Sequence, residues 1–156
     1  TYHADYFASN ELETDFKEHY YSVSREGVLR GMHFQNPPNG HNKLVYCTTG
    51  TILDVVIDLR VESPSYLAHV SLEISSELGN MLYIPEGLAH GFYSVTDATV
   101  SYNVSSTYSP ESDDGVLWNS IGMDWPDASP HISERDSSFL ALSDFQSPFK
   151  FKEASN

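Results

Sequence analysis

Cysteine is nearly absent from this chain. Cys47 is the single cysteine among 156 residues, so no internal disulfide can form. It lies in the apolar segment KLVYC, where a lone thiol is expected to be a small buried side chain. The fold must therefore be held by packing and hydrogen bonds. A reducing compartment, with the cytoplasm as the default, is the expected location.

Long apolar runs are also missing. No stretch approaches the roughly 18 consecutive apolar residues that a membrane span needs. No charged segment followed by an apolar one opens the sequence, as it would in a secretory signal. We therefore expect no membrane partner.

Basic residues are scarce. Lys and Arg together number 8, against 22 Asp and Glu, which gives a formal net charge of -14. Nucleic-acid binding depends on Lys and Arg at the phosphates, so a nucleic-acid partner is not expected. The acidity mainly favours solubility. It leaves room for a small phosphorylated ligand, because two local arginines are enough to hold a diphosphate.

Strand patterns fill most of the chain. There are 10 Tyr, 8 Phe and 2 Trp, and strands favour aromatic residues. Between residues 28 and 108, β-branched or alternating runs such as LVYC, TILDVVIDL, HVSLEIS and ATVSYNV are separated by short turns, one of them at Thr49-Gly50. This succession predicts an all-β sandwich or barrel, formed by one domain over residues 1–156.

Short flanking helices complete the predicted fold. One is expected near Asn10 to Glu18, before the first extended segment. Another is expected to begin at Ser133, whose side chain would cap Glu134 to Asp136.

One turn has the spacing of a known motif. In GNMLYIPEGLAH, the residues Gly79, Pro85, Gly87 and His90 resemble the second conserved motif of the cupins, a superfamily of small jelly-roll barrels. Gly87 would permit the tight backbone, and Pro85 would stiffen the approach to it. The resemblance implies that His90 points into the mouth of the barrel.

The first cupin motif is present in altered form. His33 matches its first histidine, but Gln35 stands at the second histidine and Lys43 at the glutamate. In metal-binding cupins these positions hold the ligands. Because a lysine ammonium has no lone pair to give and repels a cation, the set does not favour a metal.

A more specific resemblance follows from the order of the motifs. RGMHFQ, KLV, LDVVIDLR, YIPEGLAHGF, GVLW and ISERD resemble the dTDP-4-dehydrorhamnose 3,5-epimerases, a family of cupins, from about Ser22 to Asp136. The resemblance implies a cupin jelly-roll. It also implies an isomerase that inverts C3, C5 or both in a nucleotide-linked 4-keto-6-deoxy sugar. Such enzymes serve surface-polysaccharide or antibiotic-sugar pathways, with no metal or nicotinamide cofactor, and a homodimer is expected.

The resemblance assigns four residues to proton transfer. His33 would be the base that removes the proton beside the ketone, and Asp136 would fix its tautomer. Lys43 would stabilise the enolate oxygen, and Tyr102 would return a proton from the other face.

Five further residues would bind the substrate. His90 would hydrogen-bond the sugar, and Arg30 and Arg135 would hold the diphosphate. Tyr108 would line the nucleotide side, and Gln35 would lie in the same pocket.

Each of these residues has a simpler explanation when taken alone. Asp136 could merely favour the dipole of a helix start, and Arg135 could be a solvated surface charge. A histidine at a turn, such as His90, can be purely structural. Among the other charged residues, Asp54 could pair with Lys43, and Asp58 with Arg60.

Several positions depart from the family pattern. Glu18 and Tyr20 stand where the family has a Gln-x-Asn pair, and His41 stands where it usually has Gln. The N-terminal segment of the Asp-x-Arg-Gly type is not found, and LWNSIGMDWP is shorter than usual. These differences fall on the nucleotide side and leave the nucleotide and the sugar open.

Other functions remain as alternatives. A relative that inverts only C3 or only C5 would keep the same residues. So would a 3,4-ketoisomerase, which moves the ketone instead. A non-catalytic cupin that binds a nucleotide sugar and a metal-dependent dioxygenase are alternatives from other classes.

Overall fold

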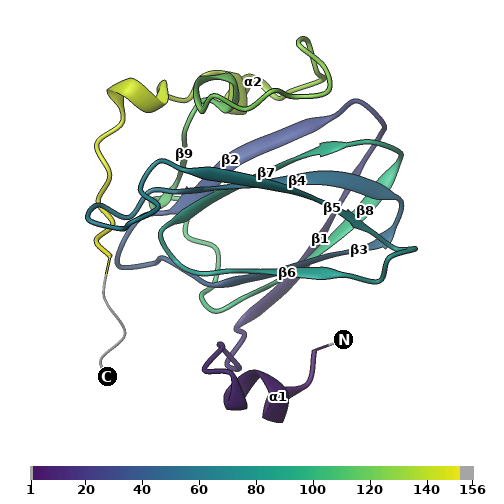
Figure 1. Cartoon of the computed structure of the whole chain (residues 1–156), viewed down its shortest axis with the longest axis vertical. Helices are drawn as coiled ribbons and strands as arrows, with labels where there is room; N and C mark the ends of the chain where they lie inside the picture. Colours follow the sequence, from purple (N-terminus) through teal and green to yellow (C-terminus); the bar gives the residue numbers. More distant parts are fainter. Residues whose placement is uncertain (1, 152–156) are drawn as a thin grey trace.

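Two antiparallel sheets packed face to face make up most of the computed structural model, which describes residues 2–151 (Figure 1). The smaller sheet has the strand order β1-β8-β3-β6 and the larger has β5-β4-β7-β2-β9. The strands of the smaller sheet are β1 Glu18–Ser24, β3 Lys43–Thr49, β6 Met81–Ile84 and β8 Ala98–Val104. Those of the larger are β2 Leu29–Gln35, β4 Thr51–Asp58, β5 His69–Ser75, β7 Leu88–Ser94 and β9 Asp113–Gly115.

The β3-β4 connection crosses from one sheet to the other. It turns at Gly50, which has φ +76°, and a Cβ atom there would lie 2.1 Å from the carbonyl oxygen of Asp97. Only glycine fits such a left-handed and crowded position. The turn predicted within LVYCTTGTILDVVIDL is therefore confirmed.

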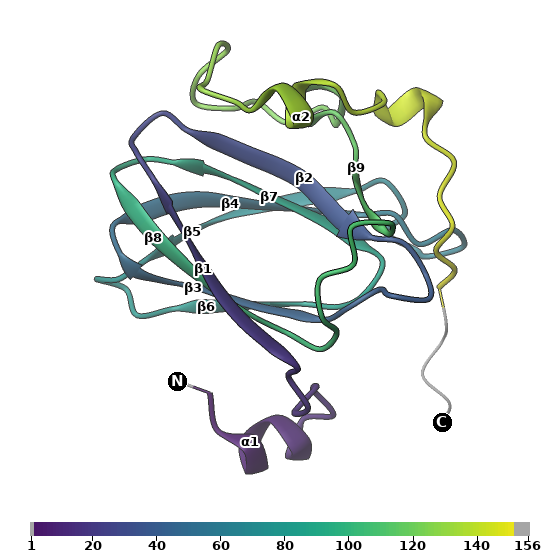
Figure 2. The same ribbon diagram turned by 180° about the vertical axis from the view of Figure 1, so that it is seen from behind.

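The first helix differs from the prediction. α1 spans Ala4–Ser9, and the side chain of His3 accepts a hydrogen bond from the backbone N–H of Tyr6 at its start. The predicted stretch Asn10 to Glu18 is irregular up to residue 17, because Glu11 turns the chain through a left-handed conformation with φ +57°, and Glu18 begins β1. α1 lies on the outer side of the smaller sheet (Figure 2), where the Phe7 ring packs edge-on against Tyr83.

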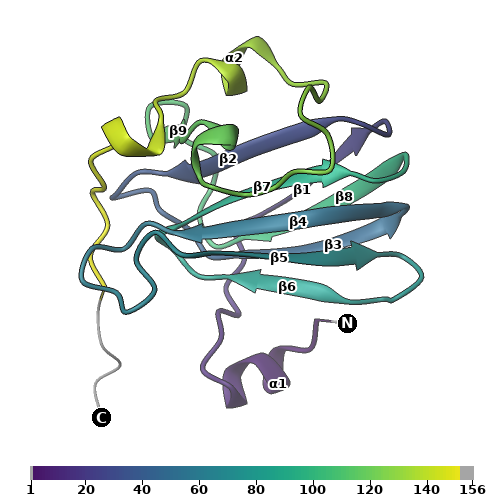
Figure 3. The same ribbon diagram turned by 45° about the horizontal axis from the view of Figure 1, so that its top comes forward.

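The C-terminal segment covers the outer face of the larger sheet (Figure 3). It carries the short 3-10 helices Trp118–Ser120 and Leu142–Asp144 and the helix α2, Glu134–Ser137. Ser133 caps α2 by accepting a hydrogen bond from the N–H of Asp136, which confirms the predicted cap. Beneath the segment lies one buried cluster: Met32, Phe34, Val55, Ile57, Leu59, Ala89, Val116, Ile121 and Phe149.

A second buried cluster fills part of the space between the two sheets. It includes Val45, Ile52, Phe92 and Val100, which are almost completely buried. At about 25 cal/mol per Å² of apolar surface, this burial is the main force holding the sheets together. The cavity described below occupies another part of this space. Within residues 2–151 no helix is long and apolar enough to cross a membrane.

Candidate active site

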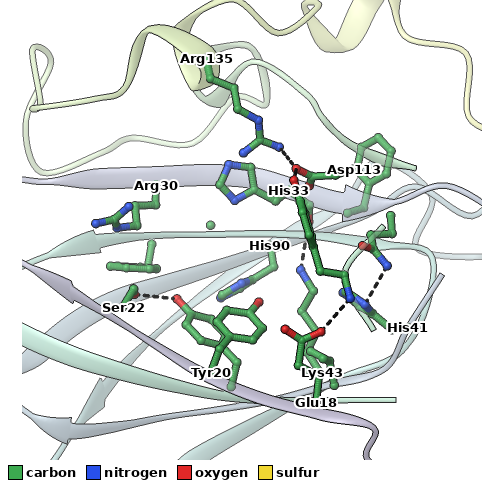
Figure 4. A pocket seen from close by; sticks show the side chains of 17 residues that line it. Glu18, Tyr20, Ser22, Arg30, His33, His41, Lys43, His90, Asp113 and Arg135 are labelled. Carbon is green, nitrogen blue, oxygen red and sulfur yellow. Dashed lines mark hydrogen bonds and ion pairs between the residues drawn. The ribbon is translucent and has the colours of Figure 1, made fainter. Parts of the chain in front are cut away.

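A cavity of about 330 Å³ opens between the sheets (Figure 4). Both sheets contribute polar side chains to it. The smaller sheet contributes Glu18, Tyr20, Ser22, Lys43 and Tyr102, and the larger contributes Arg30, His33, Gln35, His90 and Asp113. His41, Tyr108 and Arg135 reach it from connecting segments and from α2.

A β-bulge directs two of these side chains into the cavity. On β2, Arg30 pairs with Phe92 and His33 pairs with His90, so three steps along β2 match two steps along β7. In a regular strand, residues 30 and 33 would point to opposite faces. The extra residue at the bulge shifts the alternation of side chains by one position. Arg30 and His33 therefore point to the same face of β2 and both line the cavity.

Glycines make this bulge possible. Gly31 has φ +125°, and a Cβ atom there would lie 2.5 Å from the Cα of Gly91 on β7. The two backbones approach more closely than any side chain permits. The inward direction of His33 therefore depends on this pair of glycines.

His33 faces a carboxylate held by α2. Its Nε2 lies 2.9 Å from Oδ1 of Asp136, which is almost fully buried. The other oxygen of Asp136 accepts a hydrogen bond of 2.9 Å from the N–H of Gly31. The carboxylate thus ties the helix to the bulge and defines which ring nitrogen of His33 carries the proton.

Burial lowers the pKa of His33, and the positive charges of Lys43 and Arg135 lower it further, while Asp136 opposes the shift. Burial alone would raise the pKa of Asp136, but bonds from His33 and from the backbone of Gly31 outweigh it, so that pKa is lowered. His33 is therefore neutral at pH 7, as a general base must be, beside an ionised carboxylate.

Lys43 is buried within the same cavity, with 6% of the residue exposed. Its ammonium group lies 3.4 Å from the carbonyl oxygen of His33. Burial lowers its pKa to about 8, although the nearby carboxylates of Asp113 and Asp54 partly restore it. A cation with few partners of its own is well placed to stabilise a developing negative charge.

Tyr102 lies across the cavity, on the smaller sheet. It is 6% exposed, and its hydroxyl lies 3.4 Å from Oγ of Ser22. Its ring stacks on that of Tyr20, with centroids 4.7 Å apart, and meets His90 edge-on. Burial raises the pKa of the Tyr102 phenol, so it stays protonated at neutral pH.

His90 belongs to a second buried pair. Its Nε2 lies 2.8 Å from Oδ2 of Asp54, and both residues are almost fully buried. The expected pairing of Asp54 with Lys43 is therefore wrong, because β4 and β7 place Asp54 beside His90 instead. The pairing of Asp58 with Arg60 is confirmed at 2.8 Å.

Two arginines flank the cavity at different places. Arg30 donates from Nε to Oγ of Ser24. Arg135 donates from Nη2 to Asp113 at 2.6 Å, and the Tyr108 hydroxyl donates to the same carboxylate oxygen at 3.3 Å. Asp113 thus holds Arg135 and Tyr108 together at the edge of the cavity.

Gln35 fixes the adjoining loop. Its amide nitrogen donates to the carbonyl of Asn39, and its amide oxygen accepts from the N–H of Ser109. His41 lies next to it, and burial with the charge of Lys43 lowers the pKa of His41 to about 3. This part of the cavity wall is therefore neutral.

The donor set does not suit a metal ion. Within residues 2–151, no group of three His, Cys, Asp or Glu side chains is arranged to hold one. Lys43 lies near His33 and would repel a cation bound there.

Comparison with known proteins assigns the chain to a family. The family model described as dTDP-4-dehydrorhamnose 3,5-epimerase matches residues 1–144. The chain belongs to this family. The fold prediction of a cupin jelly-roll is confirmed, since the structure superposes on solved members of the dTDP-4-dehydrorhamnose 3,5-epimerase family.

Individual relatives support this assignment. The chain is 39% identical over 151 residues to the dTDP-4-dehydrorhamnose 3,5-epimerase of Sinorhizobium fredii, covering 94% of this chain and 77% of that protein. The Bacillus anthracis enzyme, solved with TDP and PPi bound, superposes with a TM-score of 0.88 at 34% identity, covering 90% and 83% of the two chains. A 3'-monoepimerase from Streptomyces bikiniensis, solved with dTDP-quinovose, has a TM-score of 0.86 at 31% identity over 91% and 74%. The protein is thus an isomerase of the epimerase class.

The cavity brings together the residues that the family resemblance selected. His33, Lys43, Tyr102, Arg30, Gln35, His90, Tyr108 and Arg135 line it, and Asp136 contacts His33 from behind. Their chemical roles remain predictions.

Sequence reasoning gave no role to several residues of the site. Tyr20, Asp113 and His41 line the cavity, and Asp54, which was expected to pair with Lys43, contacts His90 instead. For Tyr20 there was a signal, since Glu18, Tyr20 and Ser22 alternate at the period of two that places them on one face of β1. Asp113 begins β9, a strand of only three residues, which is too short to show an alternating pattern in the sequence.

Proposed function

We propose that the protein inverts C3, C5 or both in a dTDP-linked 4-keto-6-deoxy sugar, by removing and returning a proton through an enolate. Family membership supports this substrate class. So does the Legionella pneumophila 3,5-epimerase, solved with dTDP-4-keto-L-rhamnose, which superposes with a TM-score of 0.90 at 29% identity over 97% and 85% of the chains.

One observation carries the mechanism. His33 comes from the larger sheet and Tyr102 from the smaller sheet, so a base and an acid face each other across the cavity. Inversion at carbon requires the proton to leave on one face and to return on the other. A substrate ring lying between the sheets would have one group on each side.

The enolate needs a partner for its negative charge. The Lys43 ammonium is buried in the cavity close to His33, where the low dielectric strengthens its attraction for an oxyanion. We assign to Lys43 the stabilisation of the C4 oxygen as the proton leaves. His33 then loses its proton to solvent, Tyr102 gives its proton to the carbon, and the Tyr102 phenolate takes a proton from solvent.

The diphosphate would bind to Arg30 and Arg135. Arg135 is bonded to Asp113, so a diphosphate must share or replace that carboxylate. The carboxylate of Glu18 accepts a hydrogen bond of 2.7 Å from the backbone N–H of Tyr108.

The test is proton exchange in deuterated water. The protein would be incubated with dTDP-4-keto-6-deoxyglucose, and C3 and C5 would be followed by NMR. Deuterium at both carbons with a changed configuration identifies a 3,5-epimerase. Deuterium at one carbon identifies a monoepimerase.

Other outcomes would contradict the proposal. A shifted ketone would identify a 3,4-ketoisomerase. Binding without exchange would identify a nucleotide-sugar-binding cupin. The same incubation with GDP-, CDP- and UDP-linked 4-keto sugars tests the choice of nucleotide, because activity with one of these alone would overturn dTDP.

A further inference from the structure

The ring of Tyr20 forms part of the rim of the cavity. Lys43 and Tyr102 line its deep end and are almost fully buried, whereas Arg30, Arg135 and Tyr20 are exposed. Tyr20 therefore lies at the open end, together with the two arginines that are proposed to hold the diphosphate. Figure 4 shows its ring between Arg30 on one side and Lys43 on the other. C1 of the sugar, which carries the diphosphate, would then lie next to this ring.

The ring of Tyr20 is supported from behind. Tyr20 on β1 pairs directly with Tyr102 on β8, and their rings stack with centroids 4.7 Å apart and an interplanar angle of 15°. Tyr102 in turn meets His90 edge-on, and His90 is bound to Asp54 at 2.8 Å. Tyr20 is thus the outer member of a packed row of side chains. A ligand can push its ring inward only by displacing the buried members of that row.

The first inversion of the sugar needs little movement. In the chair of a 4-keto-6-deoxyglucose, the hydrogens on C3 and C5 are both axial and lie on the same face of the ring. One base on that face, the proposed His33, can therefore reach either of them. Inversion at one carbon makes a single substituent axial, either the C3 hydroxyl or the C5 methyl group, and the same chair can be kept.

A second inversion needs a larger movement. It makes the C3 hydroxyl and the C5 methyl group axial on the same face, where they clash with each other. The doubly inverted sugar relieves this clash by changing to the other chair. That change exchanges axial and equatorial positions at every carbon, including C1. The oxygen that joins C1 to the diphosphate must therefore change its direction.

Room for this movement is limited. The cavity volume of about 330 Å³ is near the lower end of the range of about 300–1,000 Å³ found for ligand pockets. While the arginines hold the diphosphate, the C1 oxygen can change direction only at the rim of the cavity, against the ring of Tyr20.

We propose that Tyr20 determines the specificity of the reaction, because its ring blocks the change of chair and so limits the protein to inverting one of the two carbons. This inference rests on the proposed function and adds no chemical step to it. Both hydrogens remain within reach of His33, so deuterium can enter at both carbons. The limit applies to the configuration of the product.

The experiment compares variants that keep the ring of Tyr20 with variants that remove it. Tyr20→Phe keeps the ring and loses the hydroxyl, whereas Tyr20→Asn and Tyr20→Thr remove the ring. Tyr21→Asn is the matched control, because Tyr21 is the next residue on β1, is 68% exposed and does not line the cavity. Each protein is incubated in deuterated water with dTDP-4-keto-6-deoxyglucose. Early samples are reduced with borohydride, and the configurations at C3 and C5 are determined by NMR.

We expect the unmodified protein, Tyr21→Asn and Tyr20→Phe to form the singly inverted sugar at least about tenfold faster than the doubly inverted one. Tyr20→Asn and Tyr20→Thr should raise the rate of the second inversion, relative to the first, by about tenfold or more. The rate of the first inversion shows that a variant is folded, so a general loss of activity cannot imitate this result.

Several outcomes would overturn the proposal for Tyr20 and leave the protein an epimerase. One is the doubly inverted sugar as the main product of the unmodified protein. Another is an unchanged ratio in both ring-free variants, or an equal rise in Tyr20→Phe. Loss of the first inversion in both ring-free variants would mean that the ring supports Tyr102 instead. If the unmodified protein neither exchanges nor inverts a carbon of any of the nucleotide sugars, the proposed function fails as well.

Discussion

At the scale of single residues, His33 has a fixed ring and a neutral charge. Replacing it with Asn removes the base but keeps a polar side chain of moderate size. We expect His33→Asn to lower kcat at least about a hundredfold, because a positioned base contributes about 10²–10⁴-fold. The melting temperature should change little. His19→Asn on the outer face of β1 is the control, and a near-normal rate for His33→Asn would remove His33 from the mechanism.

Lys43 and His33 together set the expected dependence of the reaction rate on pH. Lys43 loses its charge as the pH rises through about 8, so stabilisation of the enolate should be lost there. The pKa of His33 is lowered from 6.5, so the base becomes protonated only below its ordinary range. The profile of kcat/KM against pH should therefore fall on the alkaline side near 8 and stay high at 6.5. A profile that rises through pH 9 would contradict the role of Lys43.

Burial of the charged Lys43 side chain should also lower the free energy of unfolding. Its pKa falls from 10.5 to about 8, and a shift of this size corresponds to about 3 kcal/mol at neutral pH. Below about 8 the penalty is fully present, and it disappears as the pH rises towards 10.5. We expect Lys43→Met to be inactive yet more stable than the unmodified protein in urea at pH 7, with the difference shrinking at pH 9.5. A less stable variant at pH 7 would show that the ammonium group supports the fold.

The sequence predicted which residues line the cavity better than it predicted which residues they contact. Spacing within the cupin motifs placed His33, Lys43 and His90 in one cavity, because motif spacing follows strand length and turn length. It could not predict that Asp54 contacts His90 rather than Lys43. That contact depends on the register between β4 and β7, which no local pattern records.

At the scale of elements, the bulge in β2 determines the direction of His33, the proposed base. The bulge could not be predicted from the sequence, because a single extra residue in a strand leaves no pattern there other than a glycine. The misplaced first helix has a similar cause. Residues 10–18 have a helical composition, but the left-handed backbone of Glu11 ends α1 before them.

The bulge gives a prediction at this scale. Gly31→Ala would place a methyl group against the Cα of Gly91 in a backbone conformation that disfavours it. We expect a loss of about 2–4 kcal/mol in the free energy of unfolding, together with a large loss of activity as His33 turns away.

The control for this variant is Gly79→Ala. Gly79 also has a positive φ, of +62°, but a Cβ atom there would meet nothing within 4 Å. Thermal denaturation of both variants would separate crowding from backbone strain. Equal destabilisation of the two variants would mean that the close approach of β2 and β7 adds nothing to the destabilisation caused by Gly31→Ala.

At the scale of the whole molecule, the outer strand β1 is exposed and partly apolar. Its side chains Tyr21 and Val23 are 68% and 65% exposed, and an unpaired strand edge is a ready surface for another chain. We expect a homodimer, so light scattering should give about twice the 17.5 kDa mass of the chain. Tyr21→Glu with Val23→Lys should shift that mass towards the monomer. A monomeric unmodified protein would contradict the prediction.

The position of Asp136 late in the chain has a consequence for synthesis. Every strand in residues 2–151 is complete at Gly115, but the carboxylate that orients His33 belongs to α2. A ribosome emits the chain from its N-terminus, so the strands can pair before the base has its partner. Activity should therefore appear only after translation has passed α2. A nascent or prematurely ended chain that lacks α2 would not react with the sugar substrate.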